Sequence, residues 1–423
     1  MADSTMLLYS FLIIFVISAF SRWILTQINV AHLRRHGSRV PDVFAGEIDQ
    51  ATLAKMSAYT AESSRFGSFE SIFSDIVLLI ALLGGFFPWL NGMIQTPGLH
   101  FIFSGLLFFG ILALLSTLIG IPFDLYGTFG IEKKYGFSTI TPKLWMIDFI
   151  KGLFLSAILI GILLSAFLAL IYYAKNYWWF LVWVVFASFQ LLMLWLYPIV
   201  IAPIFNKYEP VKNEALKDAL IALMAKAGLK TEGVYQVDEG KRSKHSNAYF
   251  TGLGSTKRIV LYDTLLASHT NDEIISILAH EIGHWKKKHM IKQLVFMEAA
   301  SLAALYAASH LLEWSTLYET FGFSEVIPYA GLLLLAVIAE PLTFFLTPLA
   351  SMAIRRFERE ADDYSFMMLG TAKPMCDAVK RLAKDNLANL HPHPFYVWFY
   401  YSHPPLTERI HRLQDMEKQD FGG

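Results

Sequence analysis

Residues 145–174, WMIDFIKGLFLSAILIGILLSAFLALIYYA, form a long apolar run that decides the class of fold. About 20 apolar residues are enough for one helix to cross the hydrocarbon core of a bilayer. Runs of this kind recur along the chain, so we expect an all-α polytopic membrane protein with seven transmembrane helices. These predicted helices cover residues 6–24, 71–90, 101–122, 145–174, 177–205, 290–312 and 327–350.

The overall composition supports a membrane protein. Hydrophobic residues make up 55% of the 423 residues and charged residues 17%, whereas soluble domains are about 45–50% apolar and about 25% charged. The formal net charge is zero, so there is no electrostatic basis for expecting a nucleic-acid partner. The single cysteine, Cys376, excludes an intrachain disulfide and leaves His and carboxylate side chains as the expected metal ligands.

Lys and Arg are distributed unevenly among the predicted connections. Residues 27–70 and 123–144 contain several, whereas residues 91–100 and 313–326 contain none. Because Lys and Arg are enriched in cytoplasmic loops, we predict an N-terminus outside and a C-terminus in the cytoplasm. The expected parts are a five-helix membrane block with cytosolic loops (1–205), a small cytosolic α+β insert (206–289), transmembrane helices 6 and 7 (290–354), and a helical cytosolic tail (355–423).

Several ionisable residues interrupt the apolar runs. Buried charge is costly in lipid, so such residues indicate hydrated space among the helices. A set of local ion pairs is the alternative. The residues concerned are Asp75, Asp148, Lys151, Lys292, Glu298 and Glu340.

The segment His280-Glu281-Ile282-Gly283-His284 is an H-E-x-x-H motif. A capping box formed by Thr270 and Glu273 predicts the start of the helix that carries it. A spacing of four residues places both imidazoles on one helix face, as two ligands of one Zn²⁺ require, and Glu281 lies close enough to act as general base. Motifs with only three fixed positions also occur by chance, so ordinary surface or core histidines are the alternative.

A catalytic zinc site needs a third protein ligand, which the sequence offers downstream. Glu358 and Asp362 are four residues apart and share a helix face in what we expect to be a continuation of the last transmembrane helix. Glu358 is the candidate third ligand of a single Zn²⁺, and Asp362 a candidate acceptor that fixes a histidine tautomer. An ordinary charged helix end is the alternative.

Six sequence blocks, in order along the chain, resemble those of the type I CAAX prenyl endopeptidases, which are integral-membrane zinc metallopeptidases of the gluzincin type. The resemblance covers nearly the whole chain. The blocks are residues 132–138, 242–250, 257–266, 280–289 (H-E-x-G-H-W-x-x-x-H), 358–362 (E-x-x-A-D) and 403–409 (H-P-P-x-x-x-R).

The resemblance implies a role for each matched motif residue. His280, His284 and Glu358 would bind Zn²⁺, and Glu281 would activate the attacking water. The fold would be a ring of seven helices around a large hydrated chamber, with the active site on the cytosolic side.

The resemblance also implies roles for two further blocks. The stretch Asn247, Ala248 and Tyr249, extended to Phe250, would be an edge strand that receives an extended substrate, since an unpaired edge offers backbone donors and acceptors. His403 and Arg409 would lie near the metal and hold the substrate carbonyl or the developing oxyanion. A plain hairpin strand and structural roles are the alternatives.

The expected function is hydrolysis of peptide bonds near the C-terminus of prenylated CAAX-type or other membrane-associated proteins. A quality-control zinc protease of the membrane is one alternative, and a transporter or channel with a structural metal is another. The expected partners are a peptide or protein substrate and the lipid bilayer. Residues 418–423 contain no evident retrieval signal, which favours a bacterial inner membrane over the endoplasmic reticulum.

Overall fold

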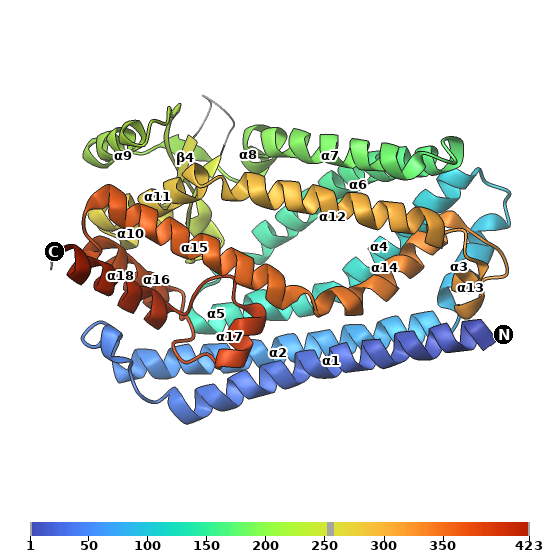
Figure 1. Ribbon diagram of the computed structural model, residues 1–423, viewed down its shortest axis with the longest axis horizontal. Coiled ribbons are helices and arrows are strands. Elements are labelled where there is room, and N and C mark those ends of the chain that lie inside the picture. Colours follow the sequence, from blue (N-terminus) through green and yellow to red (C-terminus); the bar gives the residue numbers. More distant parts are fainter. Residues whose placement is uncertain (1, 252–257, 422–423) are drawn as a thin grey trace.

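The computed structural model describes residues 2–251 and 258–421. Long helices run side by side along the longest axis, and a mixed helix and sheet region lies at one end (Figure 1). The N-terminus lies at one end of this axis and the C-terminus at the other. The mainly helical architecture and the small sheet insert confirm the predicted fold class.

Six helices, or helices with their short continuations, are long and apolar enough to cross a membrane in the described part of the chain. Many of their apolar side chains are exposed, such as Phe154 (69%) and Phe296 (74%), and lipid is the solvent that favours such exposure. The spans are α1 (Ala2–His36), α2 (Gln50–Leu83), α4 (Phe101–Leu125, continued through the π-helix Tyr126–Glu132 and α5 Lys133–Tyr135), α6 (Pro142–Tyr173), α7 (Trp178–Leu196, continued through the π-helix Tyr197–Ile201 and α8 Ala202–Phe205) and α12 (His289–Leu311).

The seventh span is a bent pair of helices. Helix α14 (Pro328–Phe344) and α15 (Thr347–Leu369) meet at 60°. The last predicted span, residues 327–350, is therefore broken after Phe344, but its final residues belong to α15, which continues into the tail as predicted. The predicted boundary at residue 355 falls inside α15.

The second predicted span is also shifted. Helix α2 ends at Leu83, and Gly85, with φ of 74°, separates it from α3 (Phe86–Gln95). This left-handed conformation suits a residue without Cβ. The apolar residues up to 90 therefore belong to a separate short helix.

The insert contains a four-stranded sheet in the order β1-β2-β4-β3. Strands β2 (Gly233–Val237) and β4 (Arg258–Tyr262) form its centre, and β1 (Tyr208–Pro210) and β3 (Ala248–Thr251) form its two edges. Helices α9 (Glu214–Lys226) and α11 (Asn271–Lys286) pack on it through a core that includes Leu220, Ile259 and Ala279. The HExxH helix is thus fixed on a small soluble core.

The tail packs against the insert at the same end of the molecule (Figure 1). Arg381 makes ion-pairing hydrogen bonds with buried Glu273, the capping-box acid of α11.

The remaining helices are the 3₁₀ helices Asp42–Phe44 and Glu239–Lys241, α10 (Asp263–Ser268), α13 (Ser315–Thr320), α16 (Lys373–Asp385), α17 (Pro394–Tyr400) and α18 (Leu406–Phe421).

Three of the six intramembrane charges named above form local ion pairs, as the alternative interpretation predicts. Arg22 joins Asp75 and Glu340 across three helices, with nitrogen–oxygen distances of 3.0 Å. Asp148 pairs with Arg242 at 2.8 Å. Hydrated space among the helices stays a prediction.

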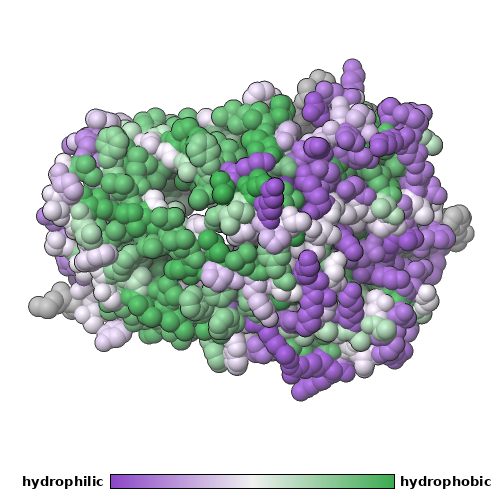
Figure 2. Space-filling view, turned by 180° about the vertical axis from the view of Figure 1, so that it is seen from behind, coloured by the Kyte–Doolittle hydropathy of each residue, from purple (hydrophilic) through white to green (hydrophobic). Residues whose placement is uncertain are grey.

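Hydrophobic and polar surfaces are segregated along the molecule. Figure 2 shows side chains of the apolar helices covering one part of the face and polar side chains covering the end that carries the insert and tail. The apolar part is visibly hollowed between helices. This division is that of a multi-pass membrane protein with a water-exposed domain at one end.

Candidate metal centre

Helix α11 begins as the sequence predicts. The Thr270 side chain accepts a hydrogen bond from the Glu273 N–H, and the Glu273 carboxylate accepts one from the Thr270 N–H. This reciprocal cap fixes the first turn. Ten residues farther on, the buried His280 and the partly exposed His284 present their rings on the same face.

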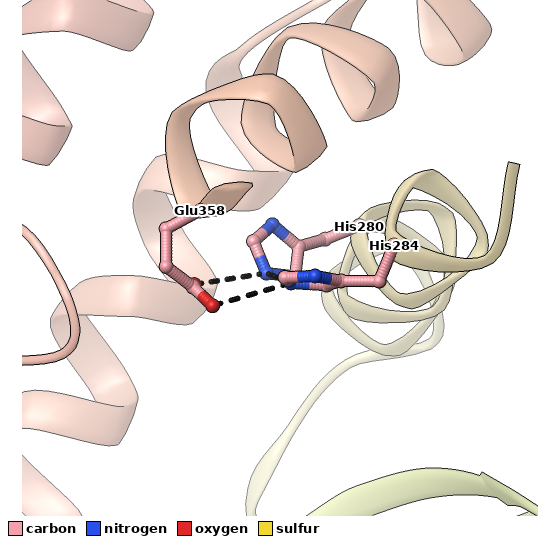
Figure 3. Close-up of side chains that lie close together, drawn as sticks. All are labelled: His280, His284 and Glu358. Atoms are coloured by element: carbon pink, nitrogen blue, oxygen red, sulfur yellow. Dashed lines mark hydrogen bonds and ion pairs between the residues drawn. The ribbon is translucent and has the colours of Figure 1, made fainter. Parts of the chain in front are cut away.

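Helix α15 brings Glu358 to these two rings (Figure 3). Its carboxylate oxygens lie 3.4 Å from His280 Nε2 and 3.3 Å from His284 Nε2. The two Nε2 atoms are 3.1 Å apart. Among the described residues, these three form the one His, Cys, Asp or Glu group whose ligand atoms could share a metal ion.

Asp362 and Arg409 lie behind His280. Asp362 Oδ1 is 2.8 Å from His280 Nδ1, so it can accept that N–H and leave the Nε2 lone pair facing Glu358. Arg409 donates two hydrogen bonds to Asp362, at 2.7 and 2.8 Å. Its guanidinium is buried against this carboxylate, and the predicted contact of Arg409 with substrate stays a prediction.

His289 supports the second ring and is a residue that the sequence analysis did not select. Its Nδ1 lies 3.0 Å from His284 Nδ1, and its Nε2 lies 3.1 Å from Glu360. If His284 binds through Nε2, its Nδ1–H donates to His289, which in turn donates to Glu360. Phe357 stacks on His289 with ring centroids 4.3 Å apart. His289 is the final histidine of the H-E-x-G-H-W-x-x-x-H block, so the sequence did contain a motif that could have indicated it.

Glu281 is partly buried, and its side chain forms no hydrogen bond or ion pair with any described residue. Burial raises the pKa of Glu281, and the neighbouring rings of His280 and His284 oppose that rise. A raised pKa favours the protonated form at a given pH and makes the carboxylate a stronger base. This is the character that a proton acceptor at neutral pH requires.

His403 reaches the same carboxylate from the tail. Its Nε2 lies 3.3 Å from Glu358 Oε2, and its side chain is 59% exposed. Ser402 Oγ lies 3.0 Å from its other ring nitrogen. His403 thus lies beside the three candidate ligands, and its predicted contact with substrate stays a prediction.

Gly283 permits the two helices to approach. A Cβ at this position would lie 2.9 Å from Ala361 Cα and 3.0 Å from Ala361 O, both backbone atoms. Such contacts are too short for carbon. The glycine of the motif and the alanine of E-x-x-A-D therefore set the distance between α11 and α15.

The predicted substrate strand is an edge strand. β3 pairs with β4 alone among the described strands. Ala248 is buried in the insert core, whereas the Tyr249 hydroxyl lies 3.2 Å from that of Tyr208. The Asn247 side chain accepts a hydrogen bond from the Ala248 N–H. Substrate binding here stays a prediction.

The donor set fits a metal ion. Glu358 Oε2 is buried and has no hydrogen-bond partner among the described residues, and it faces imidazole nitrogens. Two imidazoles and one carboxylate are the ligands of many catalytic zinc sites, which keep a further position open for water. Such a centre can hydrolyse acyl bonds when a general base stands beside it.

Comparison with known proteins decides the family. Residues 29–207 match the model of the CAAX prenyl protease N-terminal region with five membrane helices, and residues 210–417 match that of peptidase family M48. The chain belongs to the CAAX prenyl protease family. It is therefore a membrane metalloendopeptidase, and the alternative of a transporter or channel does not hold.

Relatives match over almost the whole chain. CAAX prenyl protease 1 of Saccharomyces cerevisiae is 32% identical, covering 89% of this chain and 88% of that protein. The probable CAAX prenyl protease 1 of Schizosaccharomyces pombe is 33% identical, covering 88% and 81%. The crystal structure of S. mikatae Ste24p superposes with a TM-score of 0.89 at 30% identity, covering 97% of this chain and 99% of that one.

Proposed function

We propose that this family member is a zinc endopeptidase that cleaves near the C-terminus of prenylated CAAX-type proteins. The observation that carries the proposal is the meeting of His280, His284 and Glu358 with ligand atoms in mutual reach. The printed names of the relatives, CAAX prenyl protease 1, support the substrate class.

The proposed reaction assigns one task to each residue. His280, His284 and Glu358 would hold one zinc ion per chain. Zinc, when bound, would lower the pKa of water to about 7 and polarise the substrate carbonyl. Glu281 takes the proton of the attacking water and delivers it to the leaving amine.

The supporting residues orient these groups. Asp362, held by Arg409, keeps His280 in the tautomer that exposes Nε2. His403 is placed to donate to the developing oxyanion of the substrate. The contacts around Glu358 and His280 support both assignments.

The substrate would bind as an added strand along β3, with Asn247, Ala248 and Tyr249 at that edge. Strand addition supplies backbone hydrogen bonds regardless of side chains, so it would hold many C-terminal sequences. The contacts between α11 and β3 place this edge beside the helix that carries the HExxH motif.

We propose that the metal centre faces the cytosol, with the N-terminus on the other side of the membrane. The Lys and Arg pattern and the placement of the termini at opposite ends of the long axis support this orientation. The relatives reported above are eukaryotic, so they give no support for the bacterial inner membrane expected from the sequence.

A cleavage assay with detergent-solubilised protein tests the proposal. The substrates are a farnesylated CAAX peptide, the same peptide without the farnesyl group, and an unfolded soluble protein. We expect cleavage of the farnesylated peptide with the highest kcat/KM, abolished by a zinc chelator and restored by zinc. Equal cleavage of all three would support a quality-control protease instead, and cleavage of none would contradict the proposal.

A further inference from the structure

One face of α15 carries a buried polar stripe. Its members recur at intervals of four and three residues, which keeps them on one side of a helix. None is more than 7% exposed. They are Ser351, Arg355, Glu358, Asp362 and Ser365. Glu358 and Asp362 belong to the metal centre, and Ser365 donates to the Ser276 carbonyl of α11. Ser351 and Arg355 have no part in that centre.

Both of these residues bind the carboxyl end of α17. Arg355 donates to the carbonyls of Val397 at 3.0 Å, Tyr401 at 2.5 Å and Trp398 at 3.3 Å. Ser351 donates to the Phe399 carbonyl at 3.1 Å. The last carbonyls of a helix lack partners within it, and a cation there is favoured by the helix dipole. α15 therefore caps α17.

The rest of α17 is fixed to the membrane helices. Phe399 is buried with Leu25 of α1 and Phe344 of α14. At the other end, the His393 N–H donates to the Asn29 side chain of α1 at 3.0 Å. Helix α17 thus connects the membrane helices α1 and α14 to α15.

Helix α17 ends at Tyr400, three residues before His403. Tyr401, whose carbonyl Arg355 holds, is two residues before His403, whose Nε2 lies 3.3 Å from Glu358. Glu358 is three residues after Arg355 on α15. The same helix face therefore fixes both the carboxylate and the start of the segment that brings His403 to it.

We propose that Arg355 is a positioning residue that sets where His403 stands at the metal centre. The inference rests on the proposed role of His403 in the reaction. A planar guanidinium can reach three carbonyls at once, which the single ammonium of lysine does less well. Without Arg355, the end of α17 loses three hydrogen bonds and His403 is no longer held in place. A displacement of a catalytic side chain by about 1 Å can lower the rate on the order of 100-fold.

The test compares kcat and KM on the farnesylated peptide, together with bound zinc, for Arg355→Gln, Arg355→Lys, His403→Ala and the double variant Arg355→Gln/His403→Ala. Arg39→Gln, at an arginine whose side chain is 82% exposed, is the matched control. We expect Arg355→Gln to lower kcat about 10–100-fold with unchanged zinc content and little change in KM. Arg355→Lys recovers part of the loss, and Arg355→Gln causes no further loss when His403 is already Ala.

Three results would overturn the inference. The first is parental kcat in Arg355→Gln while His403→Ala is impaired. The second is a double variant whose loss of kcat is the sum of the two single losses, and the third is loss of zinc from Arg355→Gln. Parental kcat in His403→Ala would remove the proposed role of His403, and that of Arg355 with it, without touching the role of Glu281. If Arg355→Gln does not fold, Ser351→Ala serves in its place. Its smaller loss of kcat must likewise vanish in the His403→Ala background.

Discussion

Each histidine of the metal centre has a partner on its far nitrogen. Asp362 lies at His280 Nδ1, and His289 lies at His284 Nδ1. Both Nε2 atoms face Glu358, and these contacts allow each Nδ1 to carry the ring proton and leave Nε2 free to bind a metal. Such partners orient the rings and raise the basicity of the ligand nitrogens.

Glu281→Gln tests the general base. Glutamine keeps the size of the side chain but cannot accept a proton, so we expect kcat to fall about 10²–10⁴-fold. The ligands are untouched, so the variant should keep about one zinc per chain, as measured by elemental analysis. An active variant, or one that loses its metal, would count against the assignment.

Asp362→Asn tests the partner of His280. The amide cannot provide the charge that Asp362 offers to both His280 and Arg409, so zinc affinity should fall about 10–100-fold. Competition with a chromogenic chelator measures the affinity. Asp363→Asn is the control, because Asp363 pairs with Arg412 away from the centre. Equal affinities in the two variants would show that Asp362 does not support the ligand.

At the scale of elements, the close packing of α11 on α15 creates the centre. Local signals predicted α11, since the Thr270 cap and the i, i+4 histidines lie within one helix. The break between α14 and α15 was not predicted, because the apolar residues Phe344, Phe345 and Leu346 continue across it. The contacts of His289 with Glu360 and of Arg355 with the end of α17 join segments distant in sequence, which periodicity does not reveal. Strand β1 is too short to show alternation.

Gly283→Ala tests this packing. The added methyl group would collide with the backbone of Ala361, so the helices must separate, at a cost of about 1–3 kcal/mol in stability. We expect loss of zinc and of activity in protein that remains inserted in the membrane. Gly152→Ala, where nothing lies within 4 Å of the new Cβ, is the control. Full activity in Gly283→Ala would show that the approach is not required.

At the scale of the whole molecule, the two termini lie at opposite ends of the long axis. Composition and apolar runs predicted the membrane fold well, because bilayer thickness fixes helix length. They could not predict that Arg22 forms ion pairs with both Asp75 and Glu340, since these residues meet only in the folded bundle.

Cysteine labelling of sealed vesicles of known sidedness tests the orientation. Burial raises the pKa of the native Cys376 thiol to about 12, so it stays protonated at pH 7.5 and should react slowly. A membrane-impermeant maleimide should label Thr96→Cys only from the extracytosolic side and Lys418→Cys only from the cytosolic side. The reverse pattern, or labelling of both from one side, would contradict the predicted topology.

The central claim is that two imidazoles and one distant carboxylate hold a single zinc ion. Anomalous diffraction at the zinc absorption edge, from crystals of enzymatically active protein, tests it most directly. The account predicts one strong peak about 2.0–2.2 Å from a nitrogen of His280, a nitrogen of His284 and an oxygen of Glu358. A peak bound by other residues, or no peak at this position, would contradict it.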